Sequence, residues 1–80
     1  MKYLKTYEQK HITVLNYSNQ HLTELPKLPE SLEILDCYNN KLNELPPLPE
    51  SLKLLDCYNN NLSELPELPD TLEKLFCEKK

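Results

Sequence analysis

The sequence contains no glycine, no alanine, no arginine and no tryptophan in its 80 residues. Without glycine, no loop can bring its backbone close to a phosphate group as nucleotide-binding loops do, which excludes that class of site. Its basic residues are nine lysines against thirteen Asp and Glu, for a formal net charge of −4. This acidic balance argues against nucleic acids and anionic membrane surfaces as partners.

The sequence also lacks a long hydrophobic run. No stretch approaches eighteen consecutive apolar residues, and the first ten residues, MKYLKTYEQK, hold no hydrophobic signal core. Three cysteines are an odd number and cannot form a closed disulfide framework, so a reducing compartment is the simpler interpretation. We therefore expect a cytoplasmic protein that does not enter a membrane.

Leucine, asparagine and proline are in excess, with eighteen, eight and seven residues. Written in blocks of twenty from position 21, the chain reads HLTELPKLPESLEILDCYNN, KLNELPPLPESLKLLDCYNN and NLSELPELPDTLEKLFCEKK. The first two blocks agree at fifteen of twenty positions and the last two at nine. A weaker copy precedes them, so the chain is a repeat array.

Each repeat has two halves with different periods. In LEILDCY, Leu35 and Cys37 alternate with outward residues, which is the two-residue period of a β-strand. In LTELPKLP, leucines recur at every third position, and Pro26 and Pro29 exclude a helix. Three residues per turn is the polyproline II period, so we expect an extended return segment whose leucines face inward.

Stacked units can bury leucines that a single unit cannot bury. We therefore predict a solenoid with a single curved parallel β-sheet, its strands about 4.8 Å apart, and with extended or polyproline II return segments instead of helices. Because such segments are thinner than helices, the sheet should be flatter than in repeats with helical returns. The expected organisation is an N-terminal capping segment at 1–11 and a repeat domain at 12–80, with units near 12–31, 32–51, 52–71 and a partial 72–80.

The string LxxLxCxxNxLxxLPxLPxS, which covers about 12–80, resembles the short leucine-rich repeat of bacterial effector proteins, some of which carry a separate ubiquitin-ligase domain. The variant with Cys and Asn-Asn is similar to repeat arrays in giant DNA viruses and amoeba-associated bacteria. The resemblance implies a leucine-rich-repeat solenoid, and a host-cell cytoplasmic location if the chain is an effector or a viral protein. It implies no ligase activity for these residues, because the sequence contains no catalytic domain.

The cysteines occupy an inward column. Cys37, Cys57 and Cys77 stand where a small hydrophobic residue fits, so we expect buried free thiols with a raised pKa and weak nucleophilicity. A straight ladder of thiols lacks the tetrahedral convergence of a closed metal site, and His11 and His21 have no companion ligand at metal-binding spacing. We expect no metal and no cofactor.

The repeated asparagines indicate structure rather than binding. Asn40 and Asn60, with Gln20 as a longer substitute, should hydrogen-bond the backbone of the next turn through both ends of the amide.

Three columns point outward from the predicted strands, and nothing inside the fold requires apolar or tyrosine residues there. Either such residues merely suit a sheet surface, or they form an interaction surface. Asp36 and Asp56 stand side by side, about 5 Å apart, so their repulsion must be offset by solvent, by the diagonal Lys74 or by a partner's cation. We predict a non-catalytic protein–protein interaction module that binds a partner protein, basic in character, through this concave strand face. The predicted protein-binding residues are Ile34, Asp36, Tyr38, Leu54, Asp56, Tyr58, Lys74 and Phe76.

An enzyme is the weaker hypothesis, because the outward columns contain no Cys, no His and no paired Ser that could serve as a nucleophile with its base. No catalytic residue is therefore assigned.

The ends of the stack leave two alternatives open. The leucine stack stops near Leu75 without a polar cap, and its last strand is an unpaired edge. The chain could be a structural repeat protein that self-assembles into a homo-oligomer through this C-terminal edge, or the substrate-recognition part of a longer effector or ubiquitin-ligase-type protein. At the other end, Tyr3 and Tyr7 should fold over the first repeat, and Lys79 and Lys80 would discourage edge pairing.

Overall fold

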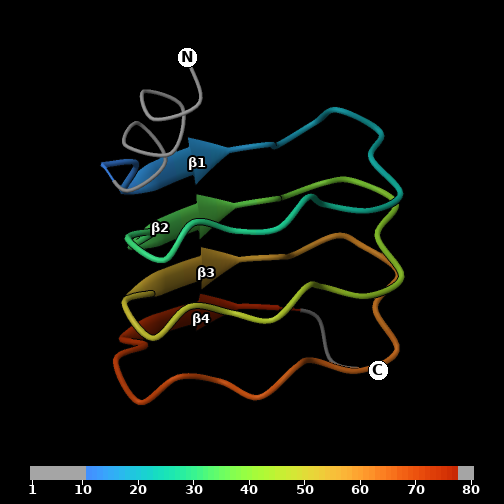
Figure 1. The fold of residues 1–80 in the computed structure, drawn as a ribbon. Coiled ribbons are helices and arrows are strands. Elements are labelled where there is room, and N and C mark those ends of the chain that lie inside the picture. The colour runs from blue at the N-terminus through green and yellow to red at the C-terminus, as the bar shows by residue number, and fades with distance from the viewer. Residues whose placement is uncertain (1–10, 78–80) are drawn as a thin grey trace.

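The computed structural model describes residues 11–77 and shows a stack of similar coils (Figure 1). Each coil contributes one three-residue strand: β1 (Val14–Asn16), β2 (Ile34–Asp36), β3 (Leu54–Asp56) and β4 (Lys74–Phe76). The strands are parallel and follow chain order in one sheet, β1-β2-β3-β4. The predicted parallel solenoid is confirmed.

The sheet register keeps equivalent residues of successive repeats in line. Leu15 pairs with Leu35, Leu35 with Leu55, and Leu55 with Leu75. A shift by one residue would turn the leucines to the other face, so burial of the leucines fixes this register. Residues that are twenty positions apart in the sequence therefore lie side by side in columns on the sheet.

The chain returns from each strand to the next without a helix. Residues 21–29, 41–49 and 61–69 contain only a bend and otherwise no regular secondary structure, as the proline spacing predicts. A tight turn at 30–31, 50–51 or 70–71 then leads into the next strand. In Figure 1 these return segments run side by side opposite the sheet.

The core lies between the strands and the return segments. Leu32, Leu35, Leu52 and Leu55 are fully buried, and each such leucine contributes about 1.5–3 kcal/mol through the hydrophobic effect. Burial weakens toward the last coil, where Leu75 is 36% exposed against 0% for Leu55. Among residues 11–77 the core cluster of buried residues is Leu25, Leu28, Leu32, Leu35, Cys37, Leu42, Leu45, Leu52, Leu55 and Cys57.

A buried asparagine joins each coil to its neighbour. The Asn40 Oδ1 accepts from the backbone N–H of Gln20 (3.1 Å) and of Leu22 (2.9 Å), and its Nδ2 donates to the carbonyls of Tyr17 (2.9 Å) and Cys37 (3.1 Å). Asn60 repeats the pattern one coil later, with the Leu42 N–H and the Cys37 and Cys57 carbonyls as partners. Both ends of the amide are used as predicted, but the partners belong to the preceding coil and to the asparagine's own coil, not to the next one. The asparagine follows its own strand by a few residues, and the backbone within its reach belongs to its own coil and to the preceding coil. Gln20 itself is exposed.

A second ladder, of hydroxyl groups, was missed by the sequence reasoning. The Ser51 Oγ donates to the carbonyls of Glu30 (2.7 Å) and Leu32 (2.6 Å), and the Thr71 Oγ1 to those of Glu50 (2.6 Å) and Leu52 (2.8 Å). The signal was the invariant Ser or Thr after each LPxLPx segment. These bonds tie the turn before each strand to the preceding coil.

The predictions about the two ends fall outside the described residues. The proposed capping segment at 1–11 lies there except for His11, and so do Tyr3, Tyr7, Lys79 and Lys80.

Candidate protein-binding surface

The structure brings the eight predicted binding residues together on one side of the sheet. Register pairs Ile34 with Leu54 and Leu54 with Lys74, while Asp36 pairs with Asp56 and Asp56 with Phe76. Tyr38 and Tyr58 follow two residues after the aspartates. We call this set of eight residues the strand face: Ile34, Asp36, Tyr38, Leu54, Asp56, Tyr58, Lys74 and Phe76.

The two tyrosines form a stacked pair. Their ring centroids lie 6.5 Å apart with an interplanar angle of 12°. Tyr38 is 39% exposed and Tyr58 is 48% exposed, so the pair stays open to solvent although each ring covers part of the other. A stack of this kind holds two aromatic side chains in place before any partner arrives, which lowers the entropy cost of using them as anchors.

Apolar side chains continue the strand face. Ile34 is 37% exposed and Phe76 is 49% exposed. Leu54, predicted to face water with Ile34, is only partly exposed because it lies between its neighbours in the middle of the column.

The two aspartates are held by their own backbone. The Asp36 Oδ1 accepts from the Tyr38 N–H at 3.0 Å, and the Asp56 Oδ1 accepts from the Tyr58 N–H at 3.1 Å. These Asx-type bonds offset part of the repulsion between the neighbouring carboxylates, an offset the sequence reasoning did not consider. Lys74 has no ion-pair partner among residues 11–77. Each aspartate keeps its second oxygen and further lone pairs for another donor.

A surface ion pair lies where the chain enters the strands. Lys53 and Glu33 approach to 3.9 Å with both side chains about half exposed, so the pair contributes at most about 1 kcal/mol.

The buried cysteines are poorly suited to nucleophilic chemistry or to metal binding. Cys37 and Cys57 are buried free thiols, and Cys77 in the last coil is partly exposed. Burial, followed by the charge of the neighbouring cysteine, raises the pKa of the Cys37 thiol from 9.0 to about 12. Burial likewise raises the pKa of Cys57 to about 11. A thiol that stays protonated at neutral pH is a poor nucleophile and a poor metal ligand.

Residues 11–77 contain no group of three or more His, Cys, Asp and Glu side chains arranged to hold a metal ion. Nor does this part of the chain leave a buried side-chain nitrogen or oxygen without a hydrogen-bond partner. In the described segment there is no helix of the length and apolar character needed to cross a membrane.

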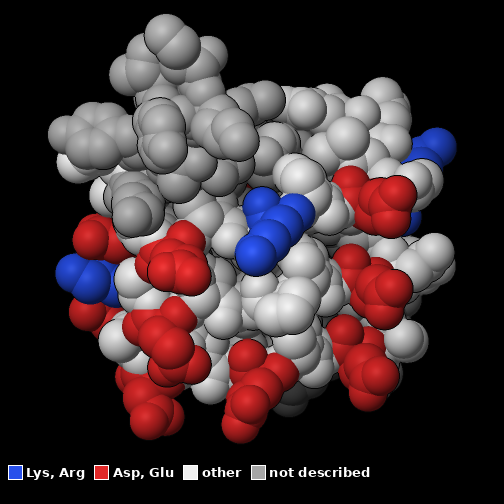
Figure 2. All heavy atoms as spheres, in the orientation of Figure 1, with Lys and Arg blue, Asp and Glu red and all other residues white. Residues whose placement is uncertain are grey.

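Acidic side chains gather away from the sheet. Figure 2 shows Asp and Glu in columns over one face of the molecule, with few lysines between them. The repeat explains this arrangement, because the same position of successive return segments carries an exposed acid in each coil: Glu24, Glu44 and Glu64 in one column, and Glu30, Glu50 and Asp70 in another.

The repeats match a known protein family. A family model described as Leucine Rich Repeat matches the chain over residues 31–52 and again over residues 51–75, which together make up more than half of it. Searches of curated proteins and of solved structures gave no significant match.

Proposed function

The chain belongs to the leucine-rich-repeat family, and on that premise we propose that it binds a partner protein through the strand face without catalysing a reaction. Leucine-rich repeats generally mediate protein–protein interactions, and repeat solenoids use the extended surface formed by their stacked units. The strand face is the part of this solenoid that carries exposed aromatic and apolar side chains in adjacent columns.

The observation that carries the proposal is the stacked Tyr38–Tyr58 pair beside Ile34 and Phe76. The core does not need these side chains, since the fully buried leucines lie on the other side of the sheet. Tyrosine and phenylalanine are enriched in protein interfaces, where an aromatic ring supplies a large contact area at low entropy cost. We therefore assign the tyrosines as anchors and the apolar residues as the centre of the contact.

The aspartates favour a basic partner. Asp36 and Asp56 are paired across β2 and β3, and no lysine neutralises them within the described residues. A lysine or arginine of the partner placed between the two carboxylates would relieve their repulsion and gain two charge-assisted hydrogen bonds. The two aspartates thus add selectivity for a basic partner to the contact area that the aromatic and apolar side chains supply.

The test is quantitative affinity capture from extracts of candidate host cells, followed by affinity measurement on the purified partner. The wild type is compared with Tyr38→Ala/Tyr58→Ala and with Tyr38→Phe/Tyr58→Phe, which keeps the rings. We expect Tyr58→Ala alone to cost about 1–3 kcal/mol of binding free energy and the double alanine variant to lose the partner, while the phenylalanine variant retains most of the affinity. Unchanged affinity in the double alanine variant would assign the partner to another surface.

A second candidate function, self-association, is favoured by the exposed last strand. Within residues 11–77 no strand pairs with the outer edge of β4, and Leu75 and Phe76 are both exposed. An unpaired edge with apolar neighbours is a template for another chain. Light scattering over a concentration series distinguishes self-association from binding to a different protein. A molar mass that rises with concentration supports self-association, whereas a constant monomer mass contradicts it.

A further inference from the structure

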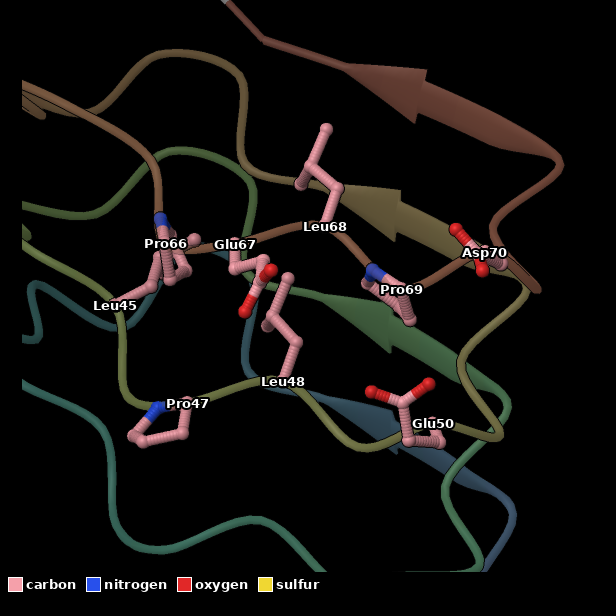
Figure 3. A pocket seen from close by; sticks show the side chains of 9 residues that line it. All are labelled: Leu45, Pro47, Leu48, Glu50, Pro66, Glu67, Leu68, Pro69 and Asp70. Atoms are coloured by element: carbon pink, nitrogen blue, oxygen red, sulfur yellow. The ribbon is translucent and has the colours of Figure 1, made fainter.

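The return side of the solenoid contains a groove that the strand-face proposal does not use. The groove has a volume of about 460 Å³, within the range of about 300–1,000 Å³ typical of ligand sites. It runs between the return segments 45–50 and 66–70 of two successive coils (Figure 3). Leu45 and Pro69 are buried beneath it and Leu48 is partly exposed, so its floor is apolar, although polar atoms make up the larger part of its exposed lining.

Three carboxylates surround this apolar floor. Glu50, Glu67 and Asp70 line the groove and are all exposed, and no lysine of residues 11–77 lines it. Figure 3 shows the Glu67 side chain reaching between the two return segments beside Leu48, while Glu50 and Asp70 stand apart, one on each segment, toward the end that leads into the next strand. Three negative charges around one groove favour a positively charged occupant.

The backbone of the groove is rich in hydrogen-bond acceptors and poor in donors. Prolines at 46, 47, 49, 66 and 69 remove five N–H groups from the two segments. No backbone hydrogen bond joins 45–48 to 65–68 in the part of the chain that the structure describes. The carbonyls of Pro49, Glu50 and Pro69 already accept hydrogen bonds within the fold, which leaves the other carbonyls of these segments as candidate acceptors for an ammonium or guanidinium group.

We propose that this groove binds an extended segment of a partner protein in which lysine or arginine alternates with apolar residues. The methylene stem of such a side chain packs on Leu45, Leu48 and Pro69, and its charged head reaches the carboxylates at the rim. The apolar residues of the segment cover the rest of the floor. This surface lies on the return side and is separate from the strand face.

The neighbouring groove shows why the site is selective for one pair of coils. A groove of similar volume, also about 460 Å³, lies between the first two return segments and shares Pro47 and Leu48 with the proposed site. Its rim carries Lys27 and Glu30, so a lysine occupies the repeat position that Glu67 holds two coils later. The local charges cancel there, and a cationic segment gains nothing from entering.

The proposal is tested by titrating the ¹⁵N-labelled full chain with the peptide acetyl-Pro-Leu-Arg-Pro-Leu-Arg-amide and following the backbone amide resonances. We expect saturable shifts at Leu48, Glu67 and Asp70, with Tyr38 and Tyr58 unaffected. The same peptide with citrulline in place of arginine, and spermidine, which has charges on short methylene chains but no leucine or proline side chains, should each bind at least about tenfold more weakly, because both the charges and the apolar residues of the segment contribute.

Two triple variants separate the groove from general acidity. Glu50→Gln/Glu67→Gln/Asp70→Asn removes the rim charges and should weaken peptide binding about tenfold or more. The matched control, Glu24→Gln/Glu44→Gln/Glu64→Gln, removes the same charge from exposed residues outside the groove and should retain the affinity within about twofold. Equal loss in both variants, shifts spread over the strand face, or no saturable binding by the wild type would overturn the proposal. If the variant Tyr38→Ala/Tyr58→Ala retains peptide binding, the groove binds the peptide independently of the strand face.

Discussion

At the scale of single residues, the amide of Asn40 illustrates how a polar side chain can be part of the core. It is 8% exposed and bonds to backbone groups of two coils. Asn60 is less buried, and its Oδ1 accepts one backbone N–H rather than two. Removing either side chain leaves backbone groups in the interior without partners, which costs more than the bond itself contributes.

We expect Asn40→Ala to lower the free energy of unfolding by about 1–3 kcal/mol, and by more than Asn60→Ala. Urea denaturation monitored by circular dichroism gives both values. Asn43→Ala is the control, because Asn43 is exposed and accepts a long, 3.3 Å hydrogen bond from the exposed Asn61. A loss for Asn40→Ala no larger than for this control would contradict the structural role of the amide.

The raised pKa values of Cys37 and Cys57 predict a specific pH dependence. In the unfolded chain a cysteine loses its proton near pH 9.0, whereas the folded chain holds it up to about pH 12 for Cys37 and about pH 11 for Cys57. Between these values the unfolded state binds fewer protons, so the free energy of unfolding falls as pH rises. Below pH 9.0 both states keep the proton and this contribution is constant and fully present.

The measurement is the free energy of unfolding at a series of pH values between about 8 and 11. Tyrosines and lysines also titrate in this range, so the informative quantity is the difference between the wild type and Cys37→Ala. The variant should lose stability less steeply with rising pH. Parallel curves for the two proteins would show that the Cys37 thiol ionises alike in both states.

At the scale of elements, the turns before the strands couple one coil to the next through a hydroxyl group. Ser51→Ala should lower the free energy of unfolding by about 1 kcal/mol, because the carbonyls of Glu30 and Leu32 lose their donor. Thermal denaturation measures the effect. Ser63→Ala, at an exposed position of a return segment, should change the melting temperature little. Equal effects would rule out the coupling.

Among the elements, the strands and return segments could be predicted from the sequence, whereas their hydrogen-bond partners and the groove could not. The strands, the helix-free returns and the inward leucines follow from periods of two and three residues and from proline chemistry, and these are local properties. The partners of Asn40 depend on the path of the backbone between coils, which the repeat alone does not specify. The bond from the Tyr38 N–H to Asp36 is local and depends on the backbone conformation just after the strand, which the alternating pattern does not specify. The groove at 45–50 and 66–70 was missed for the same reason, since it exists only where two return segments lie side by side.

At the scale of the whole molecule, stability should be distributed along the stack, because each coil contacts only its neighbours. Leu55→Ala in the third coil should cost about 2–5 kcal/mol, as expected for a cavity at a fully buried site. Leu75→Ala in the last coil should cost about 1 kcal/mol or less, because Leu75 is already partly exposed. Urea denaturation of the two variants tests this gradient, and equal losses would contradict it.

The division between buried columns that stabilise the fold and exposed columns that bind a partner is the central claim. The most direct measurement is the dissociation constant of a purified partner for the wild type and for Tyr38→Ala/Tyr58→Ala, made where both proteins are fully folded. The account predicts that the double variant loses at least about 2 kcal/mol of binding free energy, about thirtyfold in affinity. A dissociation constant that stays the same would contradict it.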